Sequence, residues 1–347
     1  MTDPIRVAGK HGRRAPKNAP AIRLGDVLKA GATIPPHPGA EDYLARMSGW
    51  QMLGNDSAGD CVAVTWSNFR RMVTALLAGH EVYPTQDQVW EVYKTQNPDF
   101  DPNGDPNVNG PGSQADEGMD IQTLLEWLVK TGGPDGVKAV AFAKVDYTNQ
   151  QELDAALAVF GGVWVGVNVL QANMDEFNAG QPWDYVAGSP LDGGHSVLAG
   201  GYEQNGGTKF ITWAAETEFT QGFLQHQVEE TWIVVWPEHL GTAQFEAGID
   251  QAALAQAYEE LTGRPFPVQP TPPTPEPTPT PVPPAPAPTP QPPAPTPVPP
   301  GPEPVPVPDT ADVTFAKILH HFVHNPWLYS PHTLANHAKE WLKAKSL

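Results

Sequence analysis

The sequence has only one cysteine, Cys61, so no disulfide can form within the chain and the fold must be stable without cross-links. It has no apolar run of about 18 residues, so we predict no transmembrane helix. It also has no apolar core behind a positively charged start, so we predict no secretory signal. We therefore expect cytoplasmic synthesis, and any work outside the cell would need release by lysis or incorporation in a phage virion.

Positive charge is scarce, because 20 Lys and Arg residues stand against 39 Asp and Glu residues, for a net charge of −19. A protein this acidic is a poor general binder of nucleic acid or anionic membranes, and we expect neither as a partner. Residues 1–45 nevertheless read as an extended arm that is basic at first and then rich in Gly and Pro. Residues 1–23 contain one acidic residue, Asp3, and six basic residues: Arg6, Lys10, Arg13, Arg14, Lys17 and Arg23. A solvated tail is the favoured interpretation, and contact with an acidic surface is the alternative.

Proline is abundant and unevenly placed, since 24 of the 41 prolines fall in residues 265–309. Such a segment cannot bury a core and favours polyproline II, so we predict a semi-rigid spacer. A docking site for a proline-binding module is the alternative.

Residues 310–347 are predicted to form a small two-helix hairpin. Asn325-Pro326 ends the first helix, and Ser330-Pro331 starts the second. Two helices of this size have little core of their own, so we expect a protein partner or self-association. His320 and His324 have the i, i+4 spacing of metal ligands, but no third ligand is evident and we predict no metal site.

Residues 46–240 mix helical and strand patterns and are the predicted folded domain, of the α+β class. Residues 241–264 then contain an amphipathic helix near Asp250–Thr262, which Gly263 should end.

Cys61 follows a run of turn residues, Gly54 to Asp60, and precedes apolar residues of helical period that continue to Gly79. The cysteine is therefore predicted at the first turn of a long, largely buried helix. The helix dipole and free backbone N–H groups favour a thiolate there, and one of these N–H groups can stabilise an oxyanion.

His195 follows Leu191-Asp192-Gly193-Gly194 and leads into an apolar segment. We predict a glycine turn and then a strand with His195 at its start. A histidine at the mouth of a strand can meet a helix N-terminus across a cleft, which makes Cys61 and His195 a candidate thiolate–imidazole pair.

These two segments together resemble the papain-like cysteine peptidases over about residues 46–240. Asn55 and Gly59 stand where that family has the Gln and Gly of a Gln-x-x-x-Gly-x-Cys pattern, and the resemblance gives Asn55 the role of oxyanion-hole donor. The 134-residue separation of Cys61 and His195 lies within the window of about 130–150 for such enzymes and exceeds that of compact cell-wall peptidases. The resemblance implies a two-lobed domain with a helical lobe and an antiparallel sheet or barrel lobe.

The third member of the catalytic set departs from the family pattern. Matching Trp213 to the tryptophan of the family's Asn-Ser-Trp-Gly run places Ile211 at the asparagine, and isoleucine cannot hydrogen-bond an imidazole. Thr212 is the nearest polar substitute, and Glu216 is a further possibility that depends on the folding of the loop.

Two further segments lie between Cys61 and His195, of which the first belongs to the papain-like resemblance and the second is a separate motif. Residues 116–120 precede an amphipathic helix over Ile121–Lys130 and resemble the turn and helix that line the papain-like cleft. Asp99-x-Asp101-x-Asn103-Gly104-Asp105 resembles the start of a calcium loop, but Gly110 stands where the closing glutamate belongs, so a polar surface loop is favoured.

Two functions follow. The first is a peptidase or amidase, possible in a phage-borne protein, in which the Cys61 thiolate attacks a peptide carbonyl, His195 is base and then acid, and Asn55 holds the oxyanion. No cofactor is expected, and the partner is a peptide or protein substrate. The alternative is a catalytically inactive papain-like scaffold, a structural or binding protein of a phage particle.

Overall fold

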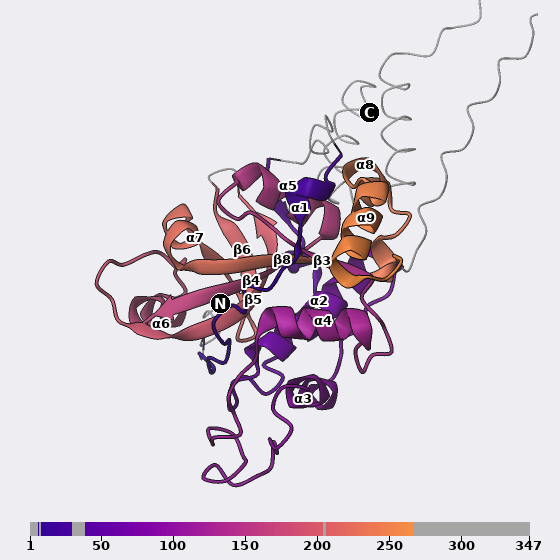
Figure 1. The fold of residues 1–347 in the computed structure, drawn as a ribbon. Coiled ribbons are helices and arrows are strands. Elements are labelled where there is room, and N and C mark those ends of the chain that lie inside the picture. Colours follow the sequence, from indigo (N-terminus) through magenta and orange to yellow (C-terminus); the bar gives the residue numbers. More distant parts are fainter. Residues whose placement is uncertain (1–5, 7, 30–38, 204–205, 267–347) are drawn as a thin grey trace, which may run out of the picture. The chain divides into compact units, whose positions relative to one another are not determined.

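The computed structural model describes residues 6, 8–29, 39–203 and 206–266, which belong to one unit of the chain (Figure 1). Its helices are α1 (Leu24–Val27), α2 (Cys61–Val73), α3 (Gln86–Lys94), α4 (Ile121–Lys130), α5 (Gln150–Phe160), α6 (Gln171–Asn178), α7 (Gln221–Gln227), α8 (Ala243–Gly248) and α9 (Gln251–Thr262). Short 3-10 segments η1 (Leu44–Arg46) and η3 (Pro237–His239) and a π-helical turn η2 (Thr74–Ala78) accompany them. The strands are β1 (Ile22–Arg23), β2 (Glu41–Asp42), β3 (Ala141–Lys144), β4 (Val163–Leu170), β5 (Leu191–Tyr202), β6 (Thr208–Thr212), β7 (Ala215–Phe219) and β8 (Val228–Val235).

The eight strands form one sheet in the order β1-β3-β8-β4-β5-β6-β7, with β2 paired to β5. The pairs are antiparallel except β1 with β3, among the described residues. The mixed helical and mostly antiparallel architecture agrees with the predicted α+β class.

Two hydrophobic cores lie on opposite faces of this sheet because successive strand residues point to opposite sides. On β4, Val163 and Val165 enter one core and Trp164 enters the other. α2, α3 and α4 pack on the Trp164 face, whereas α5 packs on the opposite face (Figure 1).

Three predicted helices begin at their predicted first residue or within one residue of it. α2 begins at Cys61 and continues through η2 to Gly79, which takes the left-handed conformation that ends many helices. The Asp120 carboxylate caps α4 by accepting from Thr123 N, and Asp250 caps α9 in the same way.

Two predictions about chain segments are wrong. Residues 191–194 do not form a glycine turn but are the first part of β5, so that His195 lies inside the strand. The basic arm is not a solvated tail in its described part: Arg13 is 6% exposed, and Leu24 and Val27 lie in the core. The proline-rich spacer after Phe266, the hairpin of residues 310–347 and its histidines lie outside the described residues.

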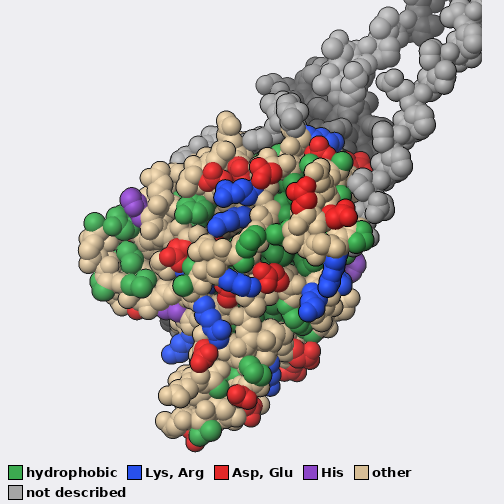
Figure 2. Space-filling view, in the orientation of Figure 1, with side chains coloured by type: hydrophobic (Ala, Val, Ile, Leu, Met, Phe, Trp, Pro, Cys, Tyr) green, Lys and Arg blue, Asp and Glu red, His purple; other side chains and the backbone are tan. Residues whose placement is uncertain are grey.

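The charged surface shows no large region of one sign on the face drawn in Figure 2, where acidic and basic side chains are interspersed. No described helix is long and apolar enough to cross a membrane.

Candidate active site

Cys61 lies at the N-terminus of α2, as predicted, and is buried with 2% exposure. The turn before it is fixed by Asp116, whose Oδ1 accepts hydrogen bonds from Gly59 N at 2.9 Å and from the Tyr93 hydroxyl at 2.5 Å. The turn that carries the nucleophile is therefore tied to the loop before α4.

His195 is buried on β5, and its Nε2 lies 2.6 Å from Oγ1 of Thr212 at the end of β6. The side chain of Trp213 lies against the imidazole, with ring centroids 4.6 Å apart. Trp213 and Ala214 form a two-residue hairpin loop in which both residues have positive φ, 45° and 59°. This is the conformation of a type I′ turn, which costs free energy in residues other than glycine and asparagine. We infer that this strained turn holds the indole over His195.

The other residues considered as the histidine's partner do not contact it. Ile211 points into the core on the opposite face of the sheet from His195, with α2. The Glu216 carboxylate accepts a hydrogen bond from Trp50 Nε1 at 3.1 Å. Thr212 is thus the one of the three candidates whose side chain reaches the imidazole.

A chain of hydroxyl groups joins β5 to α2 beside these residues. Ser196, which follows His195, donates from Oγ to Thr65 Oγ1 at 3.0 Å, and Thr65 donates to the Cys61 carbonyl at 2.8 Å. The Ser196 backbone also hydrogen-bonds to the Cys61 sulfur. Ser196 therefore ties β5 to the first turn of α2, whereas His195 Nδ1 has no hydrogen-bond partner among the described residues, the Cys61 sulfur included.

Asn55 is buried in the turn before α2, and its Nδ2 donates to the Lys10 and Ala58 carbonyl oxygens, each at 3.0 Å. The Lys10 N–H in turn donates to the Asn55 carbonyl at 2.6 Å. The predicted oxyanion donor is thus already bound to a peptide carbonyl, which belongs to the N-terminal arm.

Residues 10–14 of the arm lie across the candidate site as an extended chain. Gly12 and Arg13 both donate their N–H to the carbonyl of Gly194, at 3.1 and 2.9 Å. On the other side, Met119 N donates to Gly12 O at 2.7 Å, and Arg14 N donates to Met119 O at 2.8 Å. The arm therefore pairs through its backbone with β5 on one side and with the segment before α4 on the other.

The packing of the arm is tight enough to require glycine at Gly12. A Cβ atom there would lie 1.7 Å from the carbonyl oxygen of Gly59, which is backbone and cannot rotate away. A Cβ atom on Gly118 would lie 2.0 Å from the Gly12 oxygen. Preceding Gly12, the His11 imidazole lies against His195 and Trp213, with centroids 5.4 and 5.6 Å away, and bonds to Asp192 at 2.7 Å.

Burial holds both Cys61 and His195 in their neutral forms. Desolvation raises the pKa of the Cys61 thiol to about 12, while backbone N–H groups of Ser196 and Gly12 oppose the shift. Desolvation lowers the pKa of His195 well below its usual value, and the positive charges of His11 and Arg13 lower it further. Burial likewise raises the pKa of Asp60, next to Cys61, well above its usual range. The described state thus favours a neutral thiol at Cys61 and a neutral imidazole at His195.

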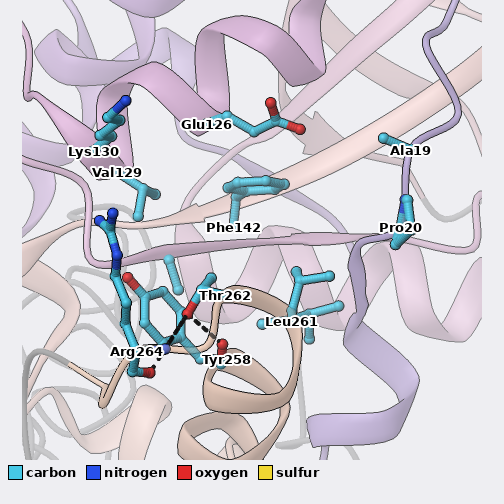
Figure 3. Close-up of a pocket in the computed structure, with 12 residues that line it drawn as sticks. Ala19, Pro20, Glu126, Val129, Lys130, Phe142, Tyr258, Leu261, Thr262 and Arg264 are labelled. Atoms are coloured by element: carbon cyan, nitrogen blue, oxygen red, sulfur yellow. Dashed lines mark hydrogen bonds between the residues drawn. The ribbon is translucent and has the colours of Figure 1, made fainter.

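A pocket of about 450 Å³ lies elsewhere, between α4, α9 and the segment Ala19-Pro20 (Figure 3). Its lining includes Phe142 and Tyr258 but no candidate catalytic residue. No group of three or more His, Cys, Asp or Glu side chains that could hold a metal ion occurs in the described residues. In the calcium-like segment, the Asp101 and Asp105 side chains accept hydrogen bonds from the backbone of Asn103 and Asn107.

Sequence reasoning missed the contribution of the arm. Arg13, Gly12 and His11 carry no recognisable motif, and the available signals were the run of basic residues in an acidic chain and the small residues among them. It also gave Trp213 no role beyond alignment, because the positive φ values of the hairpin are visible only in the structure.

Comparison with known proteins identifies the fold. No protein-family model matches the sequence, and no curated protein matches it. Xylellain, a cysteine protease from Xylella fastidiosa, is similar with a TM-score of 0.50 and 14% identity, over 68% of this chain and 99% of xylellain. A recombinant stem bromelain precursor has a TM-score of 0.43 and 13% identity over 68% and 85% of the two chains. A procathepsin B from Trypanosoma congolense has a TM-score of 0.43 and 9% identity over 67% and 86%. The likeness to xylellain confirms the predicted papain-like fold.

Proposed function

We propose that this papain-like fold carries a cysteine peptidase or amidase that hydrolyses peptide bonds at Cys61. The observation that supports this most directly is the arm itself. An extended peptide lies at the N-terminus of α2, hydrogen-bonded through its backbone to Gly194 and Met119, with a carbonyl on Asn55 Nδ2. A cleft that binds a polypeptide backbone in this way is suited to a peptide substrate.

In the proposed reaction, His195 Nδ1 takes the proton of the Cys61 thiol, and the thiolate attacks the substrate carbonyl carbon. Asn55 Nδ2 and the Cys61 N–H donate to the oxyanion. The imidazolium then gives its proton to the leaving amine, and water hydrolyses the thioester by the reverse sequence. Thr212 bonds to Nε2 and Trp213 lies against the ring, which leaves Nδ1, without a partner among the described residues, as the nitrogen that would act on the thiol.

The arm must leave before this reaction can begin. It occupies the groups that would bind substrate, the Asn55 amide and the backbone of Gly194 and Met119, and the thiol of Cys61 is buried, with a pKa raised to about 12. The proposed enzyme is therefore latent in the described conformation, and displacement of residues 10–14 would expose the thiol and rehydrate His195.

A second candidate is a papain-like binding or scaffold protein without activity. Two observations favour this candidate. Cys61 and His195 are deeply buried, at 2% and 1% exposure, and a threonine, Thr212, contacts the histidine where the papain-like family has an asparagine. In that case the arm would be a permanent part of the fold.

Peptide hydrolysis by the full-length protein distinguishes the two. The wild-type chain and a Gly12→Leu variant, in which the arm cannot fit, are incubated with a pool of fluorogenic peptides. We expect hydrolysis by the Gly12→Leu protein and much less by the wild type, with complete loss on Cys61→Ser or His195→Ala in the Gly12→Leu background. A folded Gly12→Leu protein whose Cys61 is accessible to alkylation but which cleaves no peptide would establish the scaffold function instead.

A further inference from the structure

The side chain of Arg13 enters a buried pocket formed by β4 and β8. Its guanidinium lies 2.5 Å from Glu229 Oε2, 3.3 Å from Glu230 Oε1 and 3.0 Å from Asn168 Oδ1. It also donates to the carbonyl of Val167 through Nε and a terminal nitrogen, at 3.3 and 3.2 Å. The pocket thus presents two carboxylates and two neutral oxygens to one planar cation.

The walls of this pocket are built independently of the arm. Glu230 is buried, and its Oε2 accepts a hydrogen bond from Trp232 Nε1 at 2.8 Å, which leaves Oε1 directed at the guanidinium. The register of β4 and β8 shifts between Gly166 and Val167, so that Gly166 pairs with Glu230 and Val167 with Val228. Such a bulge re-aims side chains and brings the consecutive residues Glu229 and Glu230 onto the same cation.

Glycine at position 166 provides the space for the cation. A Cβ atom there would lie 2.8 Å from Arg13 Cδ and 2.6 Å from Glu230 Cγ. The pocket therefore has the length and the charge for an arginine side chain, and its base is the sheet itself.

The position of the pocket relative to His195 indicates which part of a substrate it would bind. His11 lies against His195, the group that would protonate the leaving amine, whereas Arg13 is on the other side of Gly12. A substrate with its leaving amine at His195 and a side chain in the Arg13 pocket would therefore run in the opposite direction to the arm. That side chain would belong to the acyl part of the substrate, within two residues of the scissile bond.

We propose that this pocket, with Glu230 and Glu229 as its charged groups, selects substrates that carry arginine at that position once Arg13 has left. This inference rests on the proposed peptidase function and names its substrate class. Arginine fits better than lysine because the guanidinium is a planar fork that can meet the two carboxylates and the Asn168 oxygen at once. An apolar side chain would leave the buried Glu230 carboxylate without a cation, which carries a large free-energy penalty.

The test uses the full-length Gly12→Leu protein and fluorogenic peptides that carry arginine or its neutral isostere citrulline at each of the two acyl-side positions. We expect kcat/KM to be about 10–100-fold higher for arginine at one of these positions, the effect of a hydrogen-bonded buried charge. Glu230→Gln should remove most of this ratio, and Glu229→Gln should reduce it less because Glu229 is part-exposed. Glu91→Gln, a change of the same kind at an exposed position on α3, should leave it unaltered.

A binding measurement separates failure of this inference from failure of the peptidase. A synthetic peptide of residues 8–16 is titrated into the Gly12→Leu protein by fluorescence anisotropy, beside the same peptide with citrulline at position 13. Weaker binding of the citrulline peptide, with no difference in the Glu230→Gln protein, supports the pocket even if nothing is hydrolysed. Equal binding of the two peptides, or hydrolysis without preference for arginine, overturns the pocket as a selector while leaving the peptidase intact.

Discussion

Gly12→Leu tests whether the arm holds Cys61 in an unreactive state. A Cβ atom on residue 12 would lie 1.7 Å from the Gly59 oxygen and 2.2 Å from the Gly59 carbonyl carbon. Because these are backbone atoms of the turn before the nucleophile, the segment around residue 12 must move out of the cleft. The substitution leaves every side chain of the proposed catalytic set in place.

The size of the effect follows from the thiol pKa. Burial raises this pKa to about 12, from an ordinary value near 9.0. Since each unit is a factor of ten in thiolate fraction, complete rehydration of the thiol on removal of the arm would increase the thiolate at neutral pH by about 10³. Pairing with a rehydrated imidazolium would add to this increase.

The assay is iodoacetamide alkylation of Cys61 from about pH 5 to about pH 9, followed by mass spectrometry of the intact protein. Gly25→Leu is the matched control in the same segment, because a Cβ atom at this exposed residue meets only the flexible end of the Glu152 side chain, at 3.2 Å. We expect fast alkylation of the Gly12→Leu protein, continuing to low pH and dependent on His195, and slow alkylation of the wild type and of Gly25→Leu. Rapid alkylation of the wild-type protein at neutral pH, or an inert thiol in a Gly12→Leu protein of native circular dichroism, would refute the reasoning.

Three further predictions concern single residues. In the Gly12→Leu background, Thr212→Val should lower kcat/KM about 10–100-fold, because it removes the hydrogen bond to buried His195. Thr212→Ser keeps the hydroxyl and should retain the activity. Equal activity of the Val and Ser variants would contradict a positioning role for Thr212. Asn55→Ala in the Gly12→Leu background should lower kcat about 10²–10³-fold and leave the alkylation rate of Cys61 unchanged. A parallel loss of alkylation would show that the substitution disturbs the turn before α2 and does not merely remove an oxyanion donor. His239 is buried, and desolvation lowers its pKa to about 4, so the unfolded state binds more protons between that value and about pH 6.5. Stability should therefore fall by about 3 kcal/mol as pH drops through this window, and urea unfolding of His239→Gln should show a smaller pH dependence; an unchanged slope would contradict the assignment.

Local residue patterns were sufficient to predict where α2, α4 and α9 begin and end. The amphipathic helices over Ile121–Lys130 and near Asp250–Thr262 were predicted from local patterns, with Gly263 as the end of the second, and the structure shows Asp120 and Asp250 as their N-caps. The placement of Cys61 at a helix N-terminus followed from the same local signals. The resemblance of two short segments was enough to predict the papain-like fold.

Gly193 and Gly194, before His195, are a case in which prediction from neighbouring residues gave the wrong local structure. Gly193 and Gly194 were read as a turn, but they lie in β5 because the arm passes directly over them: Cβ atoms there would meet His11 and the Arg13 carbonyl at 2.8 and 2.3 Å. Because glycine has no side chain, these positions of β5 allow the arm to pack closely against the strand, although the two segments are about 180 residues apart in the sequence.

The sequence by itself determined the candidate nucleophile, its helix, the histidine strand and the papain-like domain, because each depends on neighbouring residues. Only the tertiary structure decided that Thr212 and not Glu216 meets His195, since this depends on which face of a hairpin each side chain occupies. The same holds for the pairing of Arg13 with Glu230 across the cleft. A buried ion pair between the first residues of the chain and its eighth strand leaves no local signal, because both partners read in sequence as ordinary surface charges.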